Sequence, residues 1–225
     1  MHAFSLPDDA IKCSCAQRGA DHVFAHIAPR HAALIVIDMQ NYLVAPGYMG
    51  EVPMARWIVP AINQLAAAVR RSGACVFWVL TSSKGAAEVW PALHSFLLTP
   101  ERSKRRLAEL AEGSTGFALW PGLDCSIRGP PNRGDTVQRL SGGSSTLWNE
   151  LQRSSIDTVL IAGTATNVCC ESSARDAMML NFKVTMVSDA CAARSDEVHR
   201  AALLNFYGYF GDVMTSGEII AALVR

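Results

Sequence analysis

Four runs of apolar, largely β-branched residues place the strongest constraint on how this 225-residue chain can fold. Each run is apolar throughout, which is typical of strands buried on both faces of a parallel sheet. Helical patterns separate the runs, so the chain forms a series of β-α-β units. We therefore expect an α/β fold, a three-layer α/β/α sandwich with a central, mostly parallel, doubly wound sheet. The runs are AALIVID (32–38), CVFWVLTS (75–82), TVLIAGT (158–164) and KVTMVSD (183–189), with DTVQRL (135–140) as a weaker fifth.

The helical segments carry recognisable starts and ends. Pro60 suits the first turn of a helix whose apolar residues repeat at helical spacing as far as Gly73. Ser145 and Ser195 are expected to cap two later helices, because a serine side chain can accept a hydrogen bond from the first turn. The segment DVMTS (212–216) is expected to contain a last strand.

Two stretches interrupt the alternation of strands and helices. Residues 1–30 show no clean period, and we expect an arm that packs on the body or on a neighbouring subunit. Residues 31–225 are expected to form a single domain. The longest gap between strands, 83–134, carries a short helical pattern and a charged one (100–110), and we interpret it as a crossover that covers one end of the sheet.

Charge and cysteine content limit the classes of function. The chain has 20 basic and 20 acidic side chains, so no net field attracts nucleic acid or an anionic membrane, and a small-molecule substrate is favoured. Seven cysteines in a largely apolar chain of this length indicate reduced thiols in the cytoplasm. Cys13 and Cys15 form the only C-x-C pair, so neither a metal site nor a cofactor is expected. No leader or membrane span is expected either.

The residues that follow each strand are the candidates for chemistry, because ligands of an open parallel sheet bind beyond the carboxyl ends of its strands. Asp38 follows the first run, and Cys169 and Cys170 lie where a helix follows the third. A carboxylate can accept a thiol proton, while a helix N-terminus and a cation favour the thiolate, so the arrangement suits acyl transfer. Two structural alternatives stay open: Asp38 could cap a turn, and cysteines often serve only as core residues.

The residues around these positions resemble the isochorismatase-like cysteine hydrolases, a family that includes nicotinamidase, N-carbamoylsarcosine amidase and ureidoacrylate hydrolase. The resemblance covers about residues 31–215 and rests on ALIVIDMQNYL (33–43) and on GTATNVCCESSARDA (163–177). It implies that Asp38 is the catalytic acid or base and Cys169 the nucleophile, with Cys170 a packing residue. It also implies a non-proline cis peptide bond, which we expect at Ala165–Thr166 beside the oxyanion. The reaction implied is hydrolysis of a C–N bond in a small amide, ureide or N-carbamoyl substrate, and members are commonly dimers or tetramers.

The sequence departs from this family at the lysine that completes its catalytic triad. The segment GDTVQRLSGGSSTLW (134–148) is about six residues short, and the chain has no lysine between Lys104 and Lys183. Arg139 lies nearest the expected position, and Lys84, just past the second run, is another possible cation. An arginine can favour a thiolate electrostatically, but it does not shuttle protons.

Two further interpretations remain open. Without its lysine the chain could be a catalytically silent binding or scaffold protein, and the adjacent cysteines could instead serve redox sensing. Four residues are expected to line the substrate pocket, although each also has a plausible structural role: Asn41, Tyr42, Lys84 and Trp90.

Overall fold

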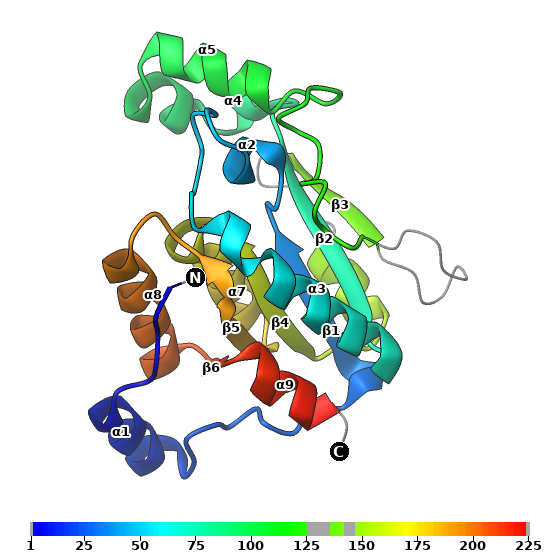
Figure 1. The fold of residues 1–225 in the computed structure, drawn as a ribbon, viewed down its shortest axis with the longest axis vertical. Coiled ribbons are helices and arrows are strands. Elements are labelled where there is room, and N and C mark those ends of the chain that lie inside the picture. The colour runs from blue at the N-terminus through cyan, green and yellow to red at the C-terminus, as the bar shows by residue number, and fades with distance from the viewer. Residues whose placement is uncertain (1, 126–135, 142–146, 224–225) are drawn as a thin grey trace.

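The computed structural model describes residues 2–125, 136–141 and 147–223. Its centre is a six-stranded sheet in the order β3-β2-β1-β4-β5-β6, and every neighbouring pair is parallel. The expected doubly wound α/β fold is confirmed (Figure 1). The strands are β1 (Ala32–Ile37), β2 (Cys75–Ser82), β3 (Thr136–Ser141), β4 (Thr158–Thr164), β5 (Lys183–Ala192) and β6 (Asp212–Met214).

Helices cover both faces of the sheet. On one face, α3 and α9 pack against alternate residues of β1, Leu34 and Val36. On the other, α6, α7 and α8 pack against Ala33, Ile35 and Ile37. Both faces of β1 are therefore buried, as its uninterrupted apolar sequence predicts. The helices of the two layers are α3 (Ala55–Ser72) and α9 (Ser216–Leu223), then α6 (Leu147–Arg153), α7 (Glu171–Met179) and α8 (Asp196–Tyr209).

The long crossover between β2 and β3 lies beyond the end of β2, at the top of Figure 1. It contains α4 (Ala86–Val89), the π-helical turn η2 (Leu93–Leu97) and α5 (Pro100–Glu109). Thr99 caps α5, because its side chain accepts a hydrogen bond from Arg102 N. The crossover meets the short helix α2 (Asn41–Val44), which follows β1, where Arg106 contacts Tyr42. This segment therefore covers the carboxyl edge of the sheet, where ligands of such folds bind.

The helix caps and helix starts expected from the sequence are confirmed in part. Ser195 caps α8 by accepting a hydrogen bond from Val198 N, as expected. Pro60, however, lies inside α3, which begins at Ala55. The apolar face extends toward the N-terminus through Ile58 and other buried residues, and one proline near a helix start removes a single hydrogen bond. Ser145 lies outside the described residues.

The N-terminal arm folds onto the body of its own chain. It contains α1 (Asp8–Arg18), which lies beside α8 and ends at Gly19 with a φ of 81°. The Arg18 guanidinium lies over the ring of Tyr207, 4.6 Å from its centroid, and donates to Gly211 O at 2.9 Å. Helix α1 was missed because its residues have little apolar period, although acidic residues at its start and glycine after its end are typical of helix termini.

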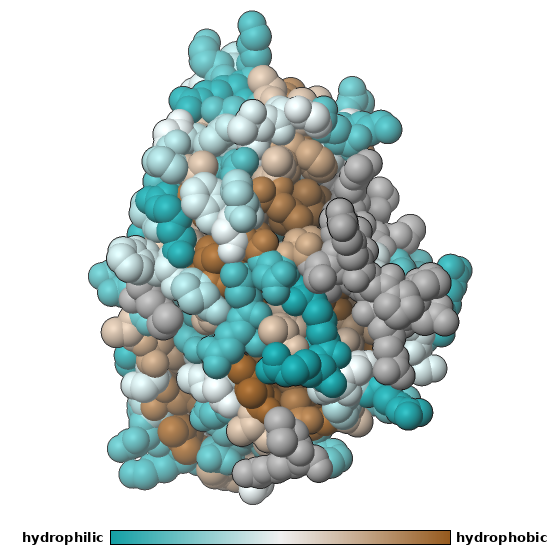
Figure 2. All heavy atoms as spheres, turned by 45° about the vertical axis from the view of Figure 1, so that its right-hand side comes forward, coloured by the Kyte–Doolittle hydropathy of each residue, from teal (hydrophilic) through white to brown (hydrophobic). Residues whose placement is uncertain are grey.

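The outer surface in Figure 2 is mostly hydrophilic, and its apolar colour gathers in separate patches rather than on one continuous face. No helix among the described residues has both the length and the apolar character needed to cross a membrane.

Candidate active site

Asp38 directly follows β1 and is held by the two strands beside it. Its backbone N–H donates to Val79 O of β2 at 2.8 Å, and its carbonyl accepts from Thr164 Oγ1 of β4 at 3.0 Å. Its carboxylate Oδ1 accepts from both the backbone N–H and the hydroxyl of Thr81, at 3.1 and 2.9 Å. The side chain thus bonds to a neighbouring strand and does not cap its own turn. Its φ of 53° is uncommon for a residue with a Cβ.

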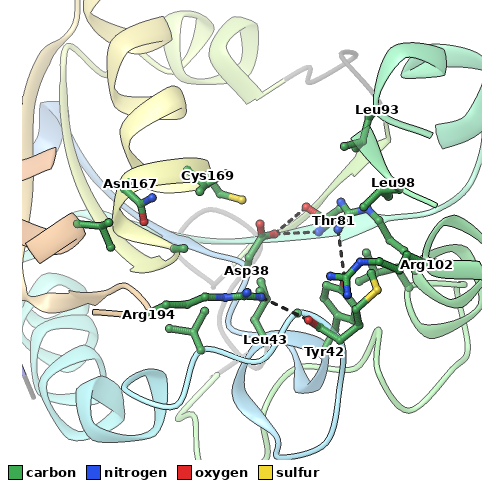
Figure 3. Close-up of a pocket in the computed structure, with 18 residues that line it drawn as sticks. Asp38, Tyr42, Leu43, Thr81, Leu93, Leu98, Arg102, Asn167, Cys169 and Arg194 are labelled. Atoms are coloured by element: carbon green, nitrogen blue, oxygen red, sulfur yellow. Dashed lines mark hydrogen bonds between the residues drawn. The ribbon is translucent and has the colours of Figure 1, made fainter. Parts of the chain in front are cut away.

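Cys169 faces this carboxylate from the π-helical turn η3 (Thr166–Cys170), which links β4 to α7 (Figure 3). Its thiol and the Asp38 carboxylate are close enough that each shifts the pKa of the other, and the backbone N–H of Ala165 acts on the same sulfur. Strands β1 and β4 are neighbours at the point where the sheet order reverses. The two candidate catalytic residues therefore meet at the position where doubly wound folds bind ligands.

Cys170 points elsewhere. It is fully buried among core residues of α7 and β4, in the same cluster as Cys191. The two adjacent cysteines therefore differ in environment, one at the cavity and one in the core. Both are free thiols.

The non-proline cis peptide bond lies at Thr164–Ala165, so the expected position, Ala165–Thr166, was wrong by one residue. The chain leaves the sheet directly after Thr164, whose hydroxyl bonds to the Asp38 carbonyl. The backbone N–H that acts on the Cys169 sulfur is that of Ala165. Thr166 is buried, and its hydroxyl bonds to His199 Nδ1 at 2.8 Å, so its side chain faces α8.

The thiol and the carboxyl of this pair both have raised pKa values. Burial raises the pKa of Asp38, and hydrogen bonds from Cys169 and Thr81 and the charge of Arg106 offset only part of that effect. Burial likewise raises the pKa of Cys169 well above its ordinary value, and the charge of Asp38 adds to the increase. Burial and the adjacent carboxylate thus oppose the thiolate that a helix N-terminus and a cation were expected to favour. The adjacent carboxylate and the desolvation outweigh the N–H of Ala165 and the charge of Arg106.

The sequence suggested two cations for this pair, Arg139 and Lys84, and the structure describes the side chain of Lys84 alone. Arg139 lies on the edge strand β3, where its backbone pairs with Leu80; its side chain is outside the described residues. Lys84 is exposed and does not line the cavity, because the chain turns after Ser82, whose hydroxyl accepts from Lys84 N.

Among the described side chains, the arginine whose charge acts on both Asp38 and Cys169 is Arg106 of α5. It lies beside Tyr42, donating to the phenol oxygen at 3.3 Å. Sequence reasoning missed it, although the spacing of Arg102 and Arg106 by four residues places both on one face of a helix that was expected to cover the sheet end.

The pair lies in a cavity of about 520 Å³. Of the pocket residues expected from the sequence, Tyr42 lines it, whereas Asn41, Lys84 and Trp90 do not. Asn41 is buried and donates from Nδ2 to Thr115 O at 2.8 Å, which anchors the crossover instead. Trp90 ends α4, and Leu93 of the following turn reaches the cavity in its place. Other lining residues are Leu43, Val52, Leu98, Arg102, Ala165, Asn167 and Arg194.

The described residues contain no cluster of three or more histidine, cysteine or acidic side chains suited to a metal ion. The described residues of the site offer a thiol, a carboxyl, backbone N–H groups and arginines.

Comparisons with known proteins agree with this site. A family model described as the isochorismatase domain matches residues 32–218. The chain is 31% identical over 214 residues to the ureidoacrylate amidohydrolase RutB of Enterobacter sp., across 87% of this chain and 90% of that protein. It is 30% identical over 180 residues to an Arabidopsis thaliana protein named a probable inactive nicotinamidase, across 78% and 88% of the two chains.

A solved structure has a similar fold over most of the chain. It is a cysteine hydrolase from Pseudomonas syringae pv. phaseolicola, with a TM-score of 0.72 and 25% identity over 88% of this chain and 95% of that one. The family model spans most of the sequence and the relatives align along most of their length, so the chain belongs to the isochorismatase family.

Proposed function

We propose that this protein hydrolyses a C–N bond in a small amide, ureide or N-carbamoyl substrate through a covalent acyl-enzyme on Cys169. The observation that carries the proposal is the contact between the Cys169 thiol and the Asp38 carboxylate inside the cavity. A relative named ureidoacrylate amidohydrolase and another named nicotinamidase support the choice of an amide-type bond.

The first half of the reaction forms the acyl-enzyme. The thiol proton passes to Asp38 as the sulfur attacks the substrate carbonyl carbon. The oxyanion formed is stabilised by the N–H of Ala165, which acts on the Cys169 sulfur, and by the N–H of Cys169. The C–N bond then breaks, and the leaving nitrogen takes the proton from Asp38 and departs as ammonia or an amine.

The second half releases the acid. Asp38 accepts a proton from water, the resulting hydroxide attacks the thioester carbonyl, and the sulfur leaves and regains its proton. The raised pKa of Asp38 makes its carboxylate a stronger base toward the thiol, whereas the raised pKa of Cys169 opposes loss of the thiol proton. The transfer is therefore placed in the same step as attack on the carbonyl carbon.

Arg106 takes part of the role of the missing lysine in this proposal. Its positive charge stabilises the anionic form of both members of the pair. It does not carry a proton between them, because a guanidinium stays protonated at ordinary pH. Proton transfer therefore runs directly between the sulfur, Asp38 and the substrate.

The second candidate function is a catalytically silent binding protein. It is favoured by the absence of a lysine between Lys104 and Lys183 and by the relative named as a probable inactive nicotinamidase. In this alternative the protein has the same fold and cavity, but Cys169 does not catalyse hydrolysis.

Ammonia release from small primary amides, ureides and carbamoyl amino acids tests the two functions, together with intact-protein mass spectrometry of the quenched reaction. We expect a substrate-dependent mass increase on Cys169 that is lost in Cys169→Ala. Binding of these compounds with neither ammonia nor an acyl adduct would favour the silent protein.

A further inference from the structure

The cavity around Cys169 is lined by three arginines, Arg102, Arg106 and Arg194. Asp38 is the only acidic residue among the described residues that line it. Figure 3 shows Arg102 and Arg194 entering from opposite sides of Asp38. The cavity is therefore electropositive overall in a chain with no net charge.

None of these arginines has a carboxylate partner within the described part of the chain. Arg106 donates to the Tyr42 hydroxyl, and Arg194 donates to the Met49 carbonyl at 3.3 Å. The guanidinium of Arg102 makes no hydrogen bond or ion pair with any described residue.

Neighbouring arginines outside the cavity are paired. Arg105, on the same helix as Arg102, donates to Glu109 at 2.7 Å, and Arg56 donates to Glu51 at 3.0 Å. The three arginines that face the cavity thus keep their charge unneutralised by a described carboxylate. A guanidinium there can form two parallel hydrogen bonds with a planar anion.

The charges of the cavity are distributed unevenly between its buried part and its mouth. Asp38 is buried at the sheet edge beside Cys169, whereas Arg102 and Arg194 are exposed at the mouth. An anionic group is repelled by Asp38 and attracted by the arginines. A ligand with one charged end therefore enters with its uncharged end toward the sulfur.

We propose that the substrate carries a carboxylate, which Arg102 and Arg106 bind with help from Arg194 while its amide or ureide carbon lies at Cys169. This substrate class, an anionic N-acyl or N-carbamoyl compound such as a carbamoyl amino acid, rests on the hydrolase function proposed above. The scissile bond and the carboxylate are separate groups of the substrate, the first beside Cys169 and the second at the arginines.

A pair of alkylating reagents tests the charge preference without requiring turnover. N-iodoacetylglycine and its uncharged amide, N-iodoacetylglycinamide, differ only in the carboxylate. Their rates of reaction with each cysteine are measured by peptide mass spectrometry. The exposed Cys13 and Cys15 serve as internal references for intrinsic reactivity. The ratio of the two rates at Cys169 cancels any change in the nucleophilicity of its sulfur.

We expect Cys169 to prefer the anionic reagent over the neutral one by about tenfold or more relative to the exposed thiols, since a charged cleft concentrates an oppositely charged ligand. Arg102→Met and Arg106→Met should each reduce the preference. Lys104→Met is the matched control, because it removes one positive charge from the same helix at an exposed position outside this cavity. An equal ratio at all three cysteines, or a ratio unchanged in both arginine variants, would overturn the proposal.

Hydrolysis of N-carbamoylglycine and of N-carbamoylglycinamide separates this inference from the function on which it rests. We expect a higher kcat/KM for the anion, and a rise in KM for the anion alone in Arg102→Met. Turnover of both compounds with equal kcat/KM would disprove the carboxylate site but keep the hydrolase. If Cys169 preferred the anionic alkylating reagent but neither compound were hydrolysed, the anion-binding site would be supported and the proposed hydrolase function would not.

Discussion

The carboxylate of Asp38 meets the thiol of Cys169 across the carboxyl ends of β1 and β4, although the two residues lie far apart in the sequence. Thr81 holds the carboxylate from the β2 side and Thr164 holds its backbone from the β4 side. The contact between Asp38 and Cys169 is thus positioned by the three adjacent strands β2, β1 and β4. Substitutions of the carboxylate and of the thiol have different expected outcomes.

The two adjacent cysteines should respond differently to substitution. Cys169→Ala should lower turnover by at least about 10⁴-fold while the protein stays folded, because the nucleophile is lost from the wall of a cavity. Cys170→Val should keep the activity and change the free energy of unfolding by less than about 1.5 kcal/mol, because it is a replacement of similar volume in an apolar core. Ammonia release and thermal unfolding measure both. Equal losses of activity in the two variants would contradict the assignment.

Asp38→Asn should have opposite effects on hydrolysis and on the ionisation of the Cys169 thiol. Hydrolysis should fall by about 10²-fold to 10⁴-fold, because the proton acceptor is removed. The pKa of Cys169 should fall at the same time, since the charge of Asp38 is one of the causes that raise it. The pH dependence of Cys169 alkylation, beside ammonia release, measures the two effects. A variant that keeps its activity would return Asp38 to a structural role.

Arg106→Met should act in the opposite direction on the thiol. Removing the positive charge raises the pKa of Cys169 further, and we expect kcat/KM to fall by roughly tenfold or more. Lys84→Met is the control, because Lys84 is exposed outside the cavity. The same alkylation profile measures the shift. A loss of activity in Lys84→Met without one in Arg106→Met would show that Lys84, and not Arg106, is the cation that the reaction needs.

The contact between the N-terminal arm and β6 should weaken at alkaline pH. The hydrogen bond to Asp212, at 2.9 Å, is the main cause that raises the pKa of His22 above 6.5. The stabilisation is therefore fully present below about pH 6.5, the unfolded value, and is lost as the pH rises through the higher folded value.

Thermal unfolding of the parent and of His22→Gln, from about pH 5.5 to pH 9, measures this contribution. The difference in Tm should be largest at acid pH and should shrink at alkaline pH. His26→Gln, at an exposed position of the same arm, is the matched control. A difference that stays constant or grows with pH would show that protonation of His22 does not hold the arm.

Much of the fold could be predicted from local sequence. The apolar runs identified five of the strands, with β2 and β4 bounded as expected, because strands buried on both faces leave an uninterrupted apolar signal. The residue that follows a parallel strand also lies at the ligand-binding edge. Asp38 and Cys169 were therefore candidates before their contact was known.

Three features were decided only by tertiary structure. The charge of Arg106 acts on the pair because α5 packs over the sheet edge. The local sequence does not specify where the chain places α5 after β2. The thiol pKa is raised because burial and a facing carboxylate act together on Cys169. The arm packs on α8 through Arg18 and Tyr207, contacts that join the two ends of the chain. Sequence periodicity determined which residues are buried in strands, whereas charges brought together from distant segments determined the chemistry of the cavity.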